Sequence, residues 1–389
     1  MTGREFLEGI QNLDETLIEE AEFGTFQRGK ARTSGKRKLL LILAAALILG
    51  TMTAAAAYTR WSATMQFGSY GGEQPSEQIK KQAKESGLSV IPGDANKGEV
   101  QKISATDNGV TVTLAQTVMD QYGGRAIFRV EGMKLEEGQV PWAWWDFQID
   151  GKSNPELSIG WGSQFFDGMT ADADGNPVYV QNGKPIPRVG KDRQLLLDYQ
   201  LADGSLEFII DFSFPQNGER FFGKEMAVTF TGFGIQGEKF EDEDIMTTSG
   251  KWELRWTLEG STEEPRRWTP NAKIGDWAVT LLEAEIGQYS MKTVYRIDEA
   301  YESQLDFSEQ TGWDIVPHGV RLEDGRELDV FGYNGSGRWD GETHTYTVIA
   351  SSLNTILDPS RIVGMYFFSG YTLNAQGFRE PQYTYVPFE

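Results

Sequence analysis

A cluster of tryptophans is the first group of side chains whose type and spacing suit a binding site. Trp142, Trp144 and Trp145 lie close together in the sequence, and flat indole rings form platforms on which sugar rings stack. On a strand, Trp142 and Trp144 share one face and Trp145 lies on the other, because successive side chains alternate. We favour core packing for the cluster as a whole, and a ligand platform for any member that faces solvent is the alternative.

An acidic loop is the second such group. Asp172, Asp174 and Asn176 alternate around Gly175, and their side-chain oxygen atoms are of the kind that calcium prefers. The spacing differs from that of an EF-hand, in which glycine is the sixth residue after three alternating ligands. We therefore expect an ordinary acidic hairpin turn and no metal, with a calcium site at these three residues as the alternative.

Neither histidine has the neighbours that catalysis requires. His318 and His344 have no serine, histidine and acid pattern or metal-ligand pattern around them, and the glycine-rich run Phe331–Gly337 lacks the lysine of a phosphate-binding loop. A glycosidase needs two carboxylates at a defined separation, which a sequence does not reveal. The absence of cysteine excludes zinc fingers, iron-sulfur sites, cysteine nucleophiles and disulfides. We expect a protein that is not an enzyme and that holds no cofactor.

The charge distribution divides the chain into two parts. The 389 residues include 36 Lys and Arg against 57 Asp and Glu, a net charge of −21, which argues against nucleic acid as a partner. Residues 1–38 hold equal numbers of basic and acidic groups, and Leu39–Tyr58 holds none. The whole net negative charge therefore lies in residues 59–389.

An apolar stretch separates these two parts. Leu39–Tyr58 has no charged residue and, at about 1.5 Å per residue, is as long as the hydrocarbon core of a bilayer is thick. Basic residues crowd the segment Arg28–Lys38 before it, so the positive-inside rule places the N-terminus in the cytoplasm. We expect a transmembrane helix over 39–59 in the cell membrane, with the C-terminal part extracellular. A cleaved secretory signal ending near Thr53–Ala57 is the alternative, which we disfavour because the apolar run is longer than that of a signal peptide.

Residues 1–38 are predicted to form a cytoplasmic docking segment with a basic linker. Thr2 and Glu5 have capping-box spacing, and Asp14 is placed to begin a second short helix. Two helices of this length bury little on their own, so we expect their apolar side chains to contact a cytoplasmic partner. The alternative is that the two helices close on each other or rest on the membrane. The predicted partner-binding residues are Phe6, Leu7, Ile10, Leu13, Leu17 and Ile18.

Residues 60–95 are predicted to form a stalk that contains one short helix. Ser76–Ser86 is a polar sequence that begins with a serine suited to an N-cap, and Gly87 follows it as a stop signal. A polar helix with no wide apolar stripe suits a spacer between a membrane and a folded domain.

The sequence beyond the stalk predicts a mainly β fold. Apolar residues alternate along Val110–Leu114, and Asp107–Gly109 is an Asp-Asn-Gly sequence typical of a tight hairpin turn. Similar turn sequences recur along the chain, with few helical stretches between them. We predict two extracellular antiparallel β-sandwich domains, at 96–250 and 251–389, with a boundary inside Phe240–Glu264.

The N-terminal pattern resembles a known class of proteins. The run FLEGIQNLDETLIEEAEFG, a basic patch and one apolar stretch together resemble the N-terminal part of membrane-anchored anti-sigma-factor-like proteins of Gram-positive bacteria. The matching positions are Ile10, Leu13, Asp14, Leu17, Ile18, Glu19, Glu20 and Ala21. In that class the cytoplasmic segment is thought to hold a sigma factor while the outer part senses the envelope. Residues 1–38 contain no His or Cys, so the zinc-binding anti-sigma domain is excluded.

The later part of the chain is similar to the same class. The segments SATDNGVTVTL and GKWELRWTL resemble the paired immunoglobulin-like β-sandwich domains, of uncharacterised function, that such proteins carry outside the membrane. The resemblance implies a single-pass regulator whose partners are a cytoplasmic sigma factor, the bilayer and an extracellular ligand. A second hypothesis stays open: a surface-exposed binding or adhesion protein for a cell-wall glycan or a protein, with no signalling role.

Overall fold

We describe the protein from a computed structural model. Everything described below belongs to the unit Ala57–Glu389. The structure describes residues 61–67, 75–92, 102–136, 139–157, 159–171, 177–181, 184–187, 199–201, 203–214, 221–237, 243–275, 279–298, 317–329, 335–350, 353, 355–373 and 379–388.

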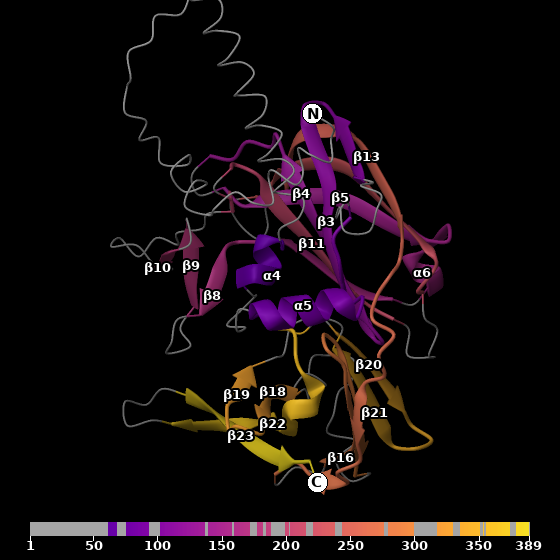
Figure 1. Cartoon of the computed structure of the whole chain (residues 1–389), viewed down its shortest axis with the longest axis vertical. Coiled ribbons are helices and arrows are strands. Elements are labelled where there is room, and N and C mark those ends of the chain that lie inside the picture. The colour runs from indigo at the N-terminus through magenta and orange to yellow at the C-terminus, as the bar shows by residue number, and fades with distance from the viewer. Residues whose placement is uncertain are drawn as a thin grey trace, which may run out of the picture. The chain divides into compact units, whose positions relative to one another are not determined.

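The first β-sandwich consists of two antiparallel sheets (Figure 1). Sheet 1 has the order β1-β3-β4-β11-β7, with β2 paired to β3: β1 (Ser89–Val90), β2 (Ser104–Asp107), β3 (Val110–Asp120), β4 (Gly123–Glu131), β11 (Leu206–Ser213) and β7 (Gly160–Phe165). Sheet 2 has the order β13-β12-β5-β6: β13 (Ile245–Thr257), β12 (Glu225–Ile235), β5 (Pro141–Ile149) and β6 (Lys152–Ser153), followed by α6 (Asn154–Leu157).

Aromatic side chains fill the space between these two sheets. Phe128 of sheet 1 and Phe230 of sheet 2 are fully buried, with ring centroids 5.4 Å apart in an edge-to-face contact. Trp252 of sheet 2 is also fully buried, and its Nε1 donates a hydrogen bond to the carbonyl oxygen of Val110 at 2.9 Å. The two sheets therefore share one core, as in a sandwich. A small sheet 3 lies outside it: β8 (Met169–Ala171), β9 (Pro177–Gln181) and β10 (Lys184–Pro187).

The second β-sandwich has its own core. Sheet 4 has the order β14-β16-β17-β21-β20, with β15 paired to β16: β14 (Arg266–Trp268), β15 (Ala272–Lys273), β16 (Val279–Ile286), β17 (Met291–Ile297), β21 (Thr345–Ala350) and β20 (Gly335–Asp340). Sheet 5 has the order β19-β18-β22-β23: β19 (Glu327–Asp329), β18 (Pro317–Leu322), β22 (Ile362–Leu373) and β23 (Arg379–Pro387), with the short helix η3 (Pro359–Arg361) before β22. Tyr295 of sheet 4 and Phe367 of sheet 5 are fully buried in the shared core.

These strands confirm the prediction of mainly antiparallel β structure. The hairpin predicted at Asp107–Gly109 joins β2 to β3, and Asp107 pairs with Val110 across it. Asn108 and Gly109 have φ angles of 46° and 79°. Both values lie in the left-handed region that tight hairpin turns require, and Asn and Gly adopt that region most readily.

One β-bulge decides which side chains of β3 face the first core. The register between β3 and β4 shifts between Leu114 and Gln116, so Ala115 is an extra residue in β3. Val110, Val112 and Leu114 therefore face the core, whereas Gln116 lies on the opposite, outer face of sheet 1. After the bulge, the side chains of β3 that would have faced the core face outward instead, which brings polar residues to that outer face.

Two helices cover the outer face of sheet 1. Figure 1 shows α4 (Ala63–Phe67) and α5 (Glu77–Glu85) beside its strands. Met65 of α4 and Ala83 of α5 are buried in a second apolar cluster, together with Val118 and Ile127 of sheet 1. The helix predicted at Ser76–Ser86 is confirmed, with the Ser76 side chain accepting a hydrogen bond from the Ile79 amide. The segment expected to be a stalk thus contributes α4, α5 and β1 to the first sandwich.

The predicted fold class requires a correction. It combined two β-sandwiches with a transmembrane helix and short cytoplasmic helices. None of the helices in the described part of the chain is long and apolar enough to cross a bilayer. The longest of them, α5, has nine residues with the sequence EQIKKQAKE, whereas a span needs about 20 apolar residues. The predicted span at Leu39–Tyr58 and the predicted cytoplasmic helices in residues 1–38 lie outside the described residues.

Candidate functional site

The predicted tryptophan cluster is divided between the two faces of sheet 2. Trp145 lies on the core face with Phe147 and contacts Phe208 of sheet 1, with ring centroids 5.8 Å apart. Its Nε1 donates a hydrogen bond to Ser163 Oγ at 3.1 Å. Trp161, which is 53% exposed, covers its outer edge with ring centroids 5.2 Å apart. Trp145 therefore closes the core and is not available as a flat platform.

Trp142 and Trp144 lie on the outer face of sheet 2 and are partly exposed. Their neighbours on β12 are Gly234 and Gly232, which have no side chains. The side chain of Met246, 44% exposed, lies over Gly232, where an added Cβ would be 2.5 Å from the Met246 methyl carbon. The flexible Met246 thioether thus covers the glycine backbone of β12 beside the two indole rings. We call these three large side chains the Trp face.

A second aromatic surface lies on the outer face of sheet 5. Along β22 and β23 the side chains alternate, so that Phe367 faces the core while its two neighbours face outward. Tyr383 is the most exposed member, at 41%. We call this surface the Tyr face. Its rings belong to His318 of β18, Tyr366 and Phe368 of β22, and Tyr383 and Tyr385 of β23.

The rings of the Tyr face form two groups. The His318 and Tyr383 rings stack with centroids 4.3 Å apart and an interplanar angle of 14°, and Phe368 contacts Tyr383 edge-on at 6.3 Å. Tyr366 and Tyr385 are cross-strand partners whose centroids are 5.1 Å apart. Because each ring supports another, the aromatic side chains are held in place on the outer face of sheet 5.

A charged pair lies beside the second ring group. The Arg321 guanidinium lies 4.5 Å from the Tyr385 centroid and 5.4 Å from that of Tyr366, both cation–π distances. Arg321 donates a hydrogen bond to Glu327 at 2.7 Å, and the Tyr366 hydroxyl donates another to the same carboxylate. These bonds from Tyr366 and Arg321 lower the pKa of Glu327. Burial and the bond to Glu327 raise the pKa of Tyr366 to about 12, so this hydroxyl stays a donor at neutral pH.

The Tyr face was missed at the sequence level, although a signal was present. Tyr366 and Phe368 are two residues apart, as are Tyr383 and Tyr385, and an aromatic residue at every second position of a strand marks one of its faces. That signal does not say whether the face is the core or the surface. The packing of sheet 5 against sheet 4 decides it, because it places Phe367 and Val386 in the shared core instead.

A buried polar junction connects the two sandwiches. Asp120, at the end of β3, accepts hydrogen bonds from the Tyr289 amide at 2.8 Å and the Ser290 amide at 3.1 Å, and another from the Ser290 hydroxyl. Tyr289 and Ser290 belong to the loop between β16 and β17 of the second sandwich. Burial raises the pKa of Asp120, against the opposing effect of these hydrogen bonds.

An ion pair lies buried on the same outer face of sheet 1. Arg125 Nε donates a hydrogen bond to Asp211 Oδ1 at 2.7 Å, and Arg125 Nη2 donates a second one to Asp211 Oδ2 at 3.1 Å. The pair is therefore bidentate. The exposed side-chain fractions are 5% for Arg125 and 1% for Asp211. Burial lowers the pKa of Arg125, but the neighbouring Asp211 charge raises it, and the net shift is upward.

A third buried carboxylate holds α4. Glu207 of β11 accepts hydrogen bonds from the amides of Ala63 and Thr64, each at 2.8 Å, and from the Thr64 hydroxyl at 2.7 Å. These amides are the first of the helix and have no partner within it, so Glu207 acts as a cap from a distant strand. Burial raises the pKa of Glu207, opposed by the bonds from Thr64 and Ala63. The sequence signal was a pair of acids, Glu207 and Asp211, on one face of an apolar strand.

The other predicted site residues receive no test from the structure. The candidate calcium ligands Asp172, Asp174 and Asn176 lie outside the described residues, as does the docking segment with Phe6, Leu7, Ile10, Leu13, Leu17 and Ile18. Within the described ranges, no three His, Asp or Glu side chains are grouped as they would be to hold a metal ion.

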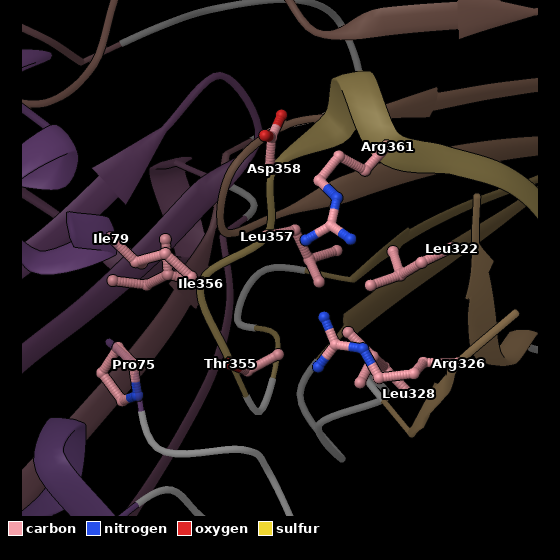
Figure 2. Close-up of a pocket in the computed structure, with 10 residues that line it drawn as sticks. All are labelled: Pro75, Ile79, Leu322, Arg326, Leu328, Thr355, Ile356, Leu357, Asp358 and Arg361. Carbon is pink, nitrogen blue, oxygen red and sulfur yellow. The ribbon is translucent and has the colours of Figure 1, made fainter. Parts of the chain in front are cut away.

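A small cavity lies between α5 and sheet 5 (Figure 2). Its volume is about 50 Å³, and apolar side chains such as Ile79 and Leu357 form much of its lining. Arg326 and Arg361 extend toward it, but both donate hydrogen bonds to Asp324, at 3.1 and 2.6 Å. A drug-sized ligand needs several hundred Å³, so this cavity suits one or two water molecules and not a substrate.

Comparison with known proteins adds little. No protein-family model matches the chain, and neither does any curated protein. Among solved structures, the crystal structure of the conserved domain protein from Bacillus anthracis has a TM-score of 0.40 at 9% identity, covering 78% of this chain and 93% of that one. The C-terminal domain of the AgI/II polypeptide BspA from Streptococcus agalactiae has a TM-score of 0.11 at 9% identity, covering 73% of this chain and 98% of that one. At these scores neither likeness carries an argument.

Proposed function

We propose that this protein is an anti-sigma-factor-like regulator of the cell membrane. In this proposal the β-sandwiches lie outside the cell and bind an envelope ligand, and residues 1–38 lie in the cytoplasm and bind a sigma factor. The resemblance of the N-terminal segment to that class supports the inner half of the proposal. It also implies a Gram-positive source and an immunoglobulin-like type for the two sandwiches, which we include in the proposal.

The position of α4 is the structural observation that carries the proposal. Glu207 of the first sandwich holds the N-terminus of α4, and the Tyr289 hydroxyl of the second sandwich lies 3.7 Å from the sulfur of Met65 in the same helix. A change in how the two sandwiches meet would therefore act on α4. Because α4 begins shortly after Tyr58, such a change would reach the chain that leads to the docking segment.

Co-purification of the full chain with its cytoplasmic partner tests the inner half. We expect a sigma factor to co-purify with the wild type and to be lost from Leu17→Asp, which places a charge among the predicted contact residues. Glu20→Gln, on the predicted outer face of the same helix, is the matched control and retains the sigma factor. If no cytoplasmic partner co-purifies with the wild type, the regulatory proposal fails.

A mild change at α4 tests the coupling. Tyr289→Phe removes the hydroxyl that contacts Met65 and leaves the ring in place. We expect this variant to keep its sigma factor but to alter sigma-dependent transcription when the envelope is perturbed. Tyr346→Phe, a change of the same kind in sheet 4, is the control. Equal transcription from wild type and Tyr289→Phe under every envelope stress would contradict the role given to α4.

The second candidate function is surface binding or adhesion without signalling. The two aromatic faces favour it, since exposed aromatic side chains are typical of binding surfaces. Under this alternative the full chain binds an extracellular glycan or protein, and no cytoplasmic partner co-purifies with it.

A further inference from the structure

The Tyr face has the chemistry of a surface that binds sugar rings. The apolar C–H groups on one side of a pyranose ring pack against the face of an aromatic side chain, which carries partial negative charge. Tyr366 and Phe368 are two positions apart on one strand, so their rings are about 7 Å apart along it. An extended sugar chain that lies along β22 therefore contacts more than one ring at a time.

The polar groups beside the rings suit hydroxyl groups. Glu327 presents a carboxylate and Arg321 a guanidinium, both planar groups that bond to pairs of adjacent oxygens. The imidazole of His318 and the hydroxyl of Tyr383 supply further hydrogen-bonding atoms next to the most exposed ring. The surface thus alternates apolar ring faces with polar groups, as a sugar chain alternates C–H faces with hydroxyl groups.

The charge balance of the Tyr face favours a neutral ligand. Glu327 lies 2.7 Å from Arg321 and compensates its positive charge. This pair therefore adds no net positive charge that would attract an anionic polymer. The net charge of the whole chain, −21, also repels polyanions. Neutral glycans meet neither obstacle.

The shape of the surface argues for a glycan over a proline-rich peptide. The outward rings come from hydrogen-bonded neighbours in one sheet, with Tyr366 opposite Tyr385 and Phe368 opposite Tyr383. These partly exposed rings lie side by side on one sheet face, with Tyr383 the most exposed, whereas proline-rich peptides dock in grooves between aromatic ridges.

We propose that the Tyr face binds a chain of neutral hexopyranose sugars. This inference rests on the proposed function in one respect, because it names the class of envelope ligand that the outer part binds. It does not depend on the sigma factor, so the two proposals fail separately.

The test is a calorimetric titration of the full chain with neutral hexasaccharides, namely a hexamer of glucose and a hexamer of N-acetylglucosamine. We expect millimolar or tighter binding of at least one, weakened tenfold or more by Tyr383→Ala and by Phe368→Ala. Tyr383→Phe keeps the ring and most of the affinity. Trp161→Ala removes an exposed ring from sheet 1 and is the matched control, with unchanged affinity.

Several outcomes would overturn the inference. These are no binding of either hexamer at about 10 mM, binding that Tyr383→Ala and Phe368→Ala leave intact, or equal weakening by Trp161→Ala. Binding of a proline-rich peptide that Tyr383→Ala weakens, with no binding of either hexamer, would assign the face to the other class of ligand. Co-purification of the sigma factor with Tyr383→Ala, measured in parallel, keeps a failure here distinct from a failure of the regulatory proposal.

Discussion

Replacing Arg125 by methionine tests the energetic role of the buried ion pair on the outer face of sheet 1. Methionine has a long, flexible side chain that fills much of the same space, but it removes the two hydrogen bonds to Asp211. The Asp211 carboxylate, 1% exposed, then loses the countercharge of Arg125. Breaking a buried pair in this way costs about 3–5 kcal/mol of unfolding free energy, far more than an exposed pair contributes.

The double variant Arg125→Met/Asp211→Leu separates charge burial from packing. With both charges removed, neither the Arg125 nor the Asp211 charge is left buried without the other, and replacing a buried pair by apolar side chains is often neutral or stabilising. We expect the free energy of unfolding of the double variant to lie within about 1 kcal/mol of that of the wild type. The loss should therefore appear in the single variant and be recovered in the double variant.

Urea unfolding at pH 7 measures both variants, with tryptophan fluorescence as the probe. Trp252 and Trp256 are buried in the core of the same sandwich, so the summed emission of the 11 tryptophans changes when that core unfolds. Two results would refute the reasoning: a loss below about 1 kcal/mol in the single variant, or a double variant as unstable as the single one.

Two further predictions concern the buried carboxylates and sheet 2. Burial raises the pKa of Glu207, so the stability of the wild type relative to Glu207→Gln is greatest below the ordinary pKa of 4.5 and is lost as the pH rises through the higher pKa of the folded state. Urea unfolding across this pH range checks it with the exposed Glu264→Gln as control, and a relative stability that grows with pH would contradict it. Gly234→Ala would place a methyl group against the Ile245 carbonyl oxygen, so we expect a loss of about 1–3 kcal/mol. Thermal unfolding measures this loss. The control is Gly341→Ala, where an added Cβ makes only an ordinary contact, and it should lower the free energy of unfolding by less than about 0.5 kcal/mol. Equal losses in the two variants would refute the steric argument.

Part of the fold could be predicted because its causes are local. The apolar alternation of Val110–Leu114 and the Asp-Asn-Gly turn before it require nothing beyond backbone sterics and strand geometry, and both predictions are confirmed. The helix α5 was predicted for the same reason, since Ser76 caps it through a bond three residues away.

The candidate sites were predicted less well because they depend on distant segments. The alternation rule correctly separated Trp145 from Trp142 and Trp144, but it did not say that Trp145 faces the core. The Tyr face needs β18, β22 and β23 side by side, and β18 and β23 are separated by more than fifty residues in the chain. The span predicted from the apolar length of Leu39–Tyr58 lies outside the described residues, and no helix of the described part is long and apolar enough to cross a bilayer.

The sequence by itself determined the strand-rich character, the turns and the charge division, because each follows from neighbouring residues. Only the tertiary structure decided where the charges of sheet 1 are buried. The bulge at Ala115 shifts the alternation of β3, so that Gln116 and Val118 lie on the outer face, and α4 then covers Glu207. An acidic side chain in an apolar strand is normally exposed. Glu207 is buried here because amides of α4 donate hydrogen bonds to it, and Asp120 because a loop of the second sandwich does so. These bonds replace those that water would otherwise supply.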